Sequence, residues 1–186
     1  MASDLWFVFL RGMNLGGRRV TNDELCTAVA ACGYEDVSAY QASGNLVIRT
    51  DASQTSVVTT IEDGLEAELG YPVPTFVRSA ADLRRLAASE PFYDSALAAS
   101  TGKRQVILLH DRPDDAILAE VQSLVPDGEV VVPDERELHW LPAAGLSDSP
   151  MDIRRLDAVT GGTTIRTHGT LQRMAAKFLD DPKGNA

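Results

Sequence analysis

The sequence predicts an α+β fold in which two split βαβ units follow one another, each with an antiparallel sheet and helices on one face. The first observation behind this is the order of periodic segments, which runs β-α-β-β-α-β and then β-α-β-β-α along the 186 residues. The second is a stretch of small and polar residues between the two series. We therefore expect a first unit at 1–90, a linker at 91–102 and a second unit at 103–186.

The first unit opens with an apolar run, Leu5–Arg11, which predicts a strand that Gly12 ends. Thr21–Glu24 predicts a capping box at the start of a helix, because the Thr21 hydroxyl can accept from the Glu24 N–H while the Glu24 carboxylate reaches back. The other expected elements are two strands joined by a hairpin turn at 41–45, a helix with one apolar stripe, a strand and a short helix: Val37–Tyr40, Leu46–Thr50, Ser53–Leu69, Val73–Arg78 and 79–88.

The second unit starts the same pattern again. A predicted strand at Arg104–His110 precedes a helix at Asp114–Val125, and two further strands form a hairpin at Glu129–Val132 and Glu137–Leu141. Beyond the hairpin the sequence predicts a short helix, a glycine-threonine loop and a last helix with a threonine cap: Pro150–Leu156, Thr160–Thr164 and Thr167.

The chain has a formal charge of −10 at pH 7, from 17 basic and 27 acidic residues. This balance repels polyanions at long range, so nucleic acid is not an expected partner. Acidic residues are absent from three windows, which hold seven basic residues: Arg11, Arg18, Arg19, Arg49, Arg166, Arg173 and Lys177, within 5–22, 37–50 and 158–179. A local positive patch and chance spacing within buried strands explain these windows equally well.

Other classes of function are not indicated. No apolar run approaches 18 residues and the N-terminus lacks a signal-peptide pattern, so we expect no membrane partner and a cytoplasmic location. Cys26 and Cys32 show no CxxC spacing and no second ligand cluster accompanies them, so we expect neither a metal site nor a disulfide, and no cofactor. The sequence does not predict an oligomeric state.

The candidate binding site lies where the loop Gly12–Thr21 meets the hairpin 41–45. In a split βαβ unit the first two strands are parallel and the third lies between them, so both segments, and the turn at 70–72, fall at one end of the sheet. Glycines let backbone N–H groups approach a ligand, arginines can clamp an anion, and the first turn of the helix is expected to add unpaired donors. The candidate ligand-binding residues are Arg11, Gly12, Asn14, Gly16, Gly17, Arg18, Gln41, Ser43, Gly44, Asn45 and Arg166. A plain glycine-rich reversal with solvated arginines is the alternative interpretation of this loop.

Three stretches also resemble the signatures of a widespread bacterial family of unknown function, recognised by its leucine-arginine-glycine-isoleucine-asparagine-valine-glycine-glycine opening. They are Leu10–Gly17, the capping box at Thr21–Glu24, and Tyr40–Val47 with its serine-glycine-asparagine core. The resemblance covers nearly the whole chain and implies a tandem of two ferredoxin-like α+β halves. It carries no established activity, and it implies that the candidate residues at 11–17 and 41–45 occupy signature positions of the family.

One C-terminal motif departs from the family pattern of threonine, a variable residue, arginine, asparagine, tryptophan, asparagine and threonine. Here Thr164, Arg166 and Thr170 are kept, whereas the three residues between Arg166 and Thr170 are replaced by Thr167-His168-Gly169. The replacement removes the aromatic side chain, and Gly169 weakens the first turn of the last helix.

These observations favour a protein that binds a small anionic molecule, phosphorylated or carboxylated, at the loop and hairpin. An enzyme acting on such a ligand is one alternative, but His110, His139 and His168 are scattered and form no known catalytic or metal spacing. An RNA-binding module on the open sheet is another, although the predicted strand Leu46–Arg49 lacks the aromatic side chains needed for stacking.

Overall fold

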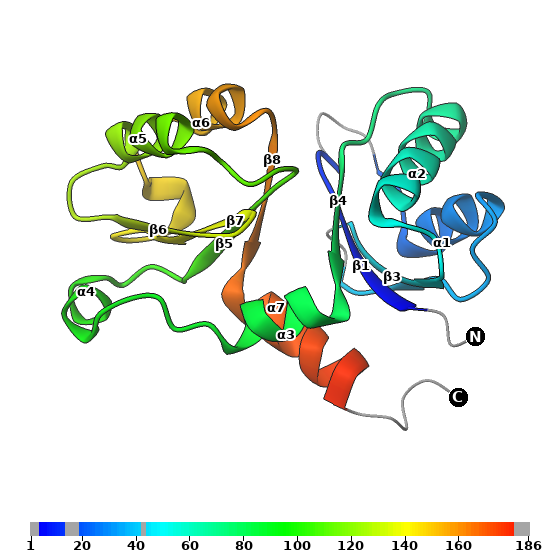
Figure 1. Ribbon diagram of the computed structural model, residues 1–186, viewed down its shortest axis with the longest axis horizontal. Helices are drawn as coiled ribbons and strands as arrows, with labels where there is room; N and C mark the ends of the chain where they lie inside the picture. Colours follow the sequence, from blue (N-terminus) through cyan, green and yellow to red (C-terminus); the bar gives the residue numbers. More distant parts are fainter. Residues whose placement is uncertain (1–3, 14–18, 42–43, 181–186) are drawn as a thin grey trace. The chain divides into compact units, whose positions relative to one another are not determined.

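The computed structural model describes residues 4–13, 19–41 and 44–180, and the chain divides into two compact units, Met1–Arg85 and Leu86–Ala186. Each unit contains a four-stranded antiparallel sheet with helices (Figure 1). The predicted fold class, a tandem of two split βαβ units, is therefore confirmed. The segment 91–102 contains a short helix, α4 (Asp94–Ala99), and its assignment as a linker stays a prediction.

In the first unit, the strand order is β2-β3-β1-β4. The order of elements along the chain is β1 (Asp4–Leu10), α1 (Asn22–Ala31), β2 (Ser38–Ala39), β3 (Asn45–Thr50), α2 (Gln54–Leu69), β4 (Thr75–Ser79) and α3 (Ala80–Ala88). Strand β1 is central and antiparallel to both neighbours, with Phe9 opposite Asn45 on β3 and Phe76 on β4. Because β3 is also antiparallel to β2, strands β1 and β2 are parallel and end at the same end of the sheet.

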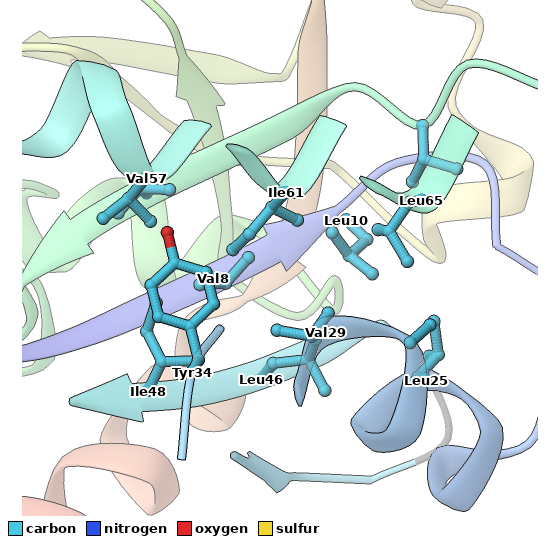
Figure 2. Close-up of a cluster of buried hydrophobic side chains, with 13 residues drawn as sticks. Val8, Leu10, Leu25, Val29, Tyr34, Leu46, Ile48, Val57, Ile61 and Leu65 are labelled. Carbon is cyan, nitrogen blue, oxygen red and sulfur yellow. The ribbon is translucent and has the colours of Figure 1, made fainter. Parts of the chain in front are cut away.

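Helices α1 and α2 cover one face of this sheet through a core of buried hydrophobic side chains (Figure 2). Val8 of β1, Val29 of α1 and Ile61 of α2 all have no exposed surface, and burial of such a side chain stabilises the fold by roughly 1.5–3 kcal/mol. The helices themselves meet at Gly64, where an added Cβ would lie 2.1 Å from Cys32 Sγ. A side chain at position 64 would therefore displace Cys32 Sγ from its present place.

The second unit repeats the same topology, with strand order β6-β7-β5-β8. Its elements are β5 (Gln105–Leu109), α5 (Asp115–Leu124), β6 (Val130–Asp134), β7 (Glu137–Leu141), a 3-10 turn at Leu146–Asp148, α6 (Ile153–Thr160), β8 (Thr163–Thr167), α7 (His168–Ala175) and a π-helical turn at Ala176–Asp180. Trp140 is buried in its core, and the indole N–H donates to Glu129 Oε2 at 2.8 Å. That bond satisfies the one polar atom of a large core side chain.

The predicted loop at Thr160–Thr164 is wrong at both ends, because Thr160 is the last residue of α6 and Thr163 is the first residue of β8. Gly161, with a left-handed φ of 74°, follows the helix as its C-cap. Ile165 of β8 lies opposite Ile107 of β5. Gly161 and Gly162 favoured the prediction of a loop. The residues that follow, Thr163 to Ile165, are β-branched and suit an edge strand.

Candidate functional site

We use the name rim for one end of the first sheet, formed by the end of β1, the β2–β3 hairpin and the start of β4. Three backbone hydrogen bonds hold it together: Leu10 N–H to Gly44 O at 2.7 Å, Arg11 N–H to Pro74 O at 2.9 Å, and Tyr40 N–H to Asn45 O at 2.8 Å. The described candidate residues Arg11, Gly12, Gln41, Gly44 and Asn45 therefore fall within one short stretch of the sheet end. Their role in binding a ligand stays a prediction.

Left-handed backbone shapes the rim. Gly12 and Gly44 have φ of 72° and 66°, and Gln41 adopts φ of 57° although it has a side chain. Such a conformation costs a non-glycine residue on the order of 1 kcal/mol. An added Cβ at Gly44 would lie 2.8 Å from Met13 Cγ and 3.1 Å from Leu10 Cβ, so glycine is needed there for both conformation and space.

Asn45 has a structural task within the rim. Its side chain has no exposed surface, and Nδ2 donates to Tyr40 O at 3.1 Å. Together with the backbone bond between the same two residues, this amide closes the hairpin. Asn45 therefore positions the glycine turn beside Arg11.

The start of α1 differs from the expectation of unpaired donors. The capping box is present, with Thr21 N–H donating to Glu24 Oε2 at 2.7 Å and Glu24 N–H donating to Thr21 Oγ1 at 3.2 Å. The hydrogen bond from the Thr21 backbone, and then the one from its hydroxyl, lower the pKa of Glu24. The positive end of α1 already faces its own carboxylate, so it adds less to an anion site than the sequence suggested.

Several candidate residues cannot be placed at the rim from the structure. Asn14, Gly16, Gly17, Arg18 and Ser43 lie outside the described residues. Arg166 lies on β8, in the second unit. For all of these, a part in the site stays a prediction.

Arg166 is largely buried on β8. Its guanidinium donates to Thr164 Oγ1 at 2.8 Å and to Ile165 O at 2.9 Å. Burial lowers the pKa of Arg166 to about 10, so the side chain stays charged at neutral pH. The guanidinium thus donates to two neighbours on its own strand. The assignment of Arg166 to a ligand site stays a prediction.

Sequence reasoning missed a cavity of about 470 Å³ in the second unit, beside the first turn of α7. Lys103, Arg104 and Arg173 line it, together with the residues that replace the family motif at 167–169. The available signals were the adjacent pair of basic residues before β5 and the altered motif itself. The sequence gives no indication that these two segments lie together, because they are more than 60 positions apart in the chain.

Two further findings bear on the class of site. Across residues 4–13, 19–41 and 44–180, His, Cys, Asp and Glu form no group of three or more that could hold a metal ion. In the same ranges, the helices are too short or too polar to cross a membrane. Cys26 and Cys32 are both free thiols.

Comparison with known proteins supports the fold and a family. A family model described as "Protein of unknown function (DUF1697)" matches residues 5–139. A conserved bacterial protein from Streptococcus pneumoniae has a similar structure, with a TM-score of 0.73 and 20% sequence identity over 94% of this chain and 98% of that chain. At this identity the likeness concerns the fold alone. No curated protein matches the sequence.

Proposed function

We propose that this chain, which belongs to the family Protein of unknown function (DUF1697), binds a small anionic molecule at the rim of its first unit. The observation that carries the proposal is the 2.7 Å hydrogen bond from Leu10 N–H to Gly44 O, which brings the Arg11–Gly12 turn against the glycine hairpin. Arg11 precedes one left-handed glycine, and the second lies in the hairpin bonded to Leu10; an arginine next to glycine turns of this kind suits phosphate or carboxylate groups.

Charge distribution supports an anion as the ligand. The chain carries −10 in total, yet both segments of the rim lie in windows without acidic residues, 5–22 and 37–50. No acidic residue therefore lies within six positions of Arg11 in the sequence. The two other functions considered from the sequence, an enzyme acting on such a ligand and an RNA-binding module, gain no supporting observation from the described residues.

Calorimetric titration with nucleotides and sugar phosphates tests the proposal on the wild-type chain and on Arg11→Gln. Charge-assisted hydrogen bonds are worth about 1.5–3 kcal/mol, so the loss of Arg11 should weaken binding at least tenfold. Arg49→Gln is the matched control, because Arg49 lies opposite Leu5 at the other end of β1 in the same sheet. Equal affinity in all three proteins, or no binding in any, would contradict the proposal.

A further inference from the structure

Three of the residues that line the cavity of the second unit are cationic: Lys103, Arg104 and Arg173. It is lined by the segment before β5, the end of β7 and the first turns of α7, and no lining residue is a carboxylate. The segments that supply its cations lack acidic residues from 95 to 110 and from 158 to 179. Arg104 is paired with Glu90, whereas Lys103 and Arg173 form no ion pair with the described part of the chain. Two cations therefore remain for a ligand.

One wall of the cavity is held in place by close backbone contact. Ser100 Oγ donates to Pro142 O at 2.5 Å, and Thr101 N–H donates to Ala143 O at 3.0 Å. An added Cβ on Gly102 would lie 2.2 Å from Ala144 O, so only glycine allows this approach. The wall that carries Lys103 is thus fixed before any ligand arrives.

The first turn of α7 faces the cavity with its backbone. His168 N–H donates to Arg104 O at 2.9 Å, and Thr170 N–H donates to the capping Thr167 Oγ1 at 3.2 Å. Between them, Gly169 lines the cavity at a first-turn position, where a backbone N–H has no partner within its own helix. Unpaired N–H groups at a helix start carry the positive end of the dipole and bind anions.

His168 provides a second, independent sign of a missing partner. The side chain lines the cavity and is only 3% exposed, and Nε2 lies 3.0 Å from Leu86 O. Because a carbonyl oxygen only accepts, Nε2 carries the proton and Nδ1 is left as an acceptor. Nδ1 is buried and has no hydrogen-bond partner. A buried acceptor without a partner is costly, so a group that satisfies it must donate a hydrogen bond. The P–OH group of a singly protonated phosphate is such a donor, whereas its ionised oxygens only accept.

We propose that this cavity is a second anion site, independent of the rim, which takes the phosphate group of a small phosphorylated molecule. Lys103, Arg173 and the Gly169 N–H would share the phosphate oxygens, and the charge of two cations suits a dianion better than a carboxylate. The cavity volume of about 470 Å³ falls within the range of roughly 300–1,000 Å³ that is usual for small-molecule sites.

Calorimetric titration with inorganic phosphate tests this site in the full-length chain. Arg173→Gln should weaken phosphate binding at least tenfold, and Arg173→Lys should restore most of the affinity. Arg154→Gln is the matched control, since Arg154 is an exposed arginine on α6 of the same unit and does not line the cavity. Equal weakening in Arg173→Gln and Arg154→Gln, or no saturable binding by the wild type, would overturn the proposal.

Nuclear magnetic resonance separates this site from the rim. Phosphate should shift the Gly169 amide signal in a saturable way in the wild type and in Arg11→Gln, but the shift should need much more phosphate in Arg173→Gln. A Gly169 signal that phosphate leaves unchanged while Arg11→Gln abolishes calorimetric binding would overturn the second site and keep the first. Circular dichroism of each variant confirms that the fold is intact.

Discussion

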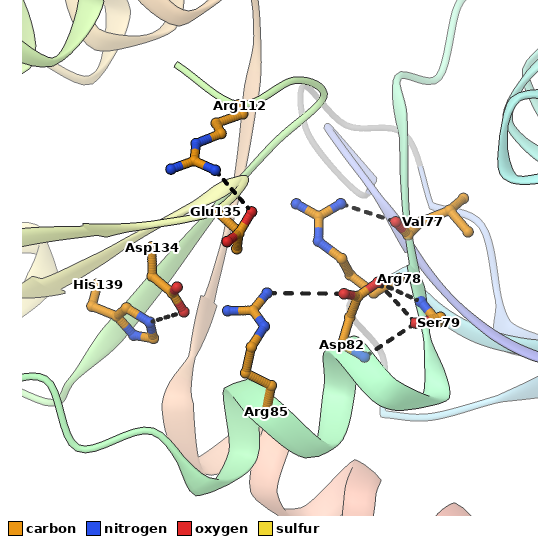
Figure 3. Close-up of polar contacts among 9 residues, drawn as sticks. All are labelled: Val77, Arg78, Ser79, Asp82, Arg85, Arg112, Asp134, Glu135 and His139. Carbon is orange, nitrogen blue, oxygen red and sulfur yellow. Dashed lines mark hydrogen bonds and ion pairs between the residues drawn. The ribbon is translucent and has the colours of Figure 1, made fainter. Parts of the chain in front are cut away.

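The two units use a similar strand-to-helix junction, and they differ in the charge at its third helical position. In the first unit, Arg78 sits one residue before the end of β4 and its guanidinium donates to Val77 O at 2.9 Å (Figure 3). In the second unit, Arg166 holds the same position on β8 and donates to Ile165 O at 2.9 Å. Each strand then ends in a hydroxyl residue that caps the following helix.

The difference lies at the third helical position. At the start of α3, Asp82 Oδ2 accepts from Ser79 N–H at 3.0 Å and from Ser79 Oγ at 2.9 Å, so a carboxylate closes the helix end. At the start of α7, the corresponding residue is Thr170, which carries no charge. The Asp82 carboxylate thus neutralises the positive end of the α3 dipole, whereas the third residue of α7 brings no carboxylate to the positive end of that helix. This difference agrees with the anion site that we propose beside α7.

The helix pairs of the two units also differ: α1 and α2 approach closely at Gly64, whereas α5 and α6 are linked by an exposed ion pair. The largest expected effect on stability comes from a substitution at Gly64. Gly64→Ala should destabilise the first unit by about 1–2 kcal/mol. The new methyl group would lie 2.1 Å from Cys32 Sγ and displace it from its hydrogen bond to Ala28 O, and this cost exceeds the roughly 1 kcal/mol that alanine gains over glycine inside a helix. The Cys32 Cβ lies 3.6 Å away, an ordinary contact, so Cys32→Ala should remove most of the cost in the double variant. Urea denaturation of the four proteins measures the coupling.

Purely additive effects of Gly64→Ala and Cys32→Ala would contradict this account of the crossing.

The helix pair of the second unit is the comparison, since an exposed ion pair between Arg155 and Glu120 links α6 to α5 there. Glu120→Gln should cost less than about 1 kcal/mol, as is usual for surface ion pairs.

A smaller effect is expected when the two junctions are made alike. Thr170→Asp places a carboxylate at the third position of α7, where it can accept from the Thr167 N–H as Asp82 does from Ser79. Phosphate binding at the cavity should fall about tenfold, equal to about 1.4 kcal/mol, while the free energy of unfolding stays equal or rises. Thr170→Asn, which adds no charge, is the control. Unchanged phosphate binding in Thr170→Asp would show that the open helix end is not part of the site.

The sequence was sufficient for features that depend on neighbouring residues. Periodicity and caps predicted both hairpins, the Thr167 cap and the helices other than α4, because each depends on residues within about one turn or one strand pair. The helix expected at Pro150–Leu156 lies at Ile153–Thr160 instead. Strand β8 was missed because glycines precede it. The cavity was missed because its walls meet only after β5 has paired with both β7 and β8. Long-range pairing of this kind leaves no local pattern in the sequence.

A pH dependence of stability is expected from the histidines of the second unit. The three histidines lie at 110, 139 and 168, all beyond Arg85. Burial lowers the pKa of His139, against the opposing charges of Asp134 and Glu137. Burial and then the charge of Arg104 lower the pKa of His168, against the carbonyl of Leu86 and the charge of Glu90. Both side chains are therefore neutral in the folded state where the unfolded chain is protonated.

The unfolded state binds more protons below the ordinary histidine pKa of about 6.5, so stability is full above that pH and is lost as the pH falls towards the folded-state values. The slope should stay below about 1.4 kcal/mol per pH unit for each histidine. In Trp6→Phe, the remaining Trp140 fluorescence reports the second unit during urea unfolding at pH 7.5, 6.5 and 5.5. His168→Asn should flatten the curve, because it removes a histidine whose pKa is lowered in the folded state. The same slope in His168→Asn and in its parent would mean that carboxylates, and not the buried imidazole, set the response to acid.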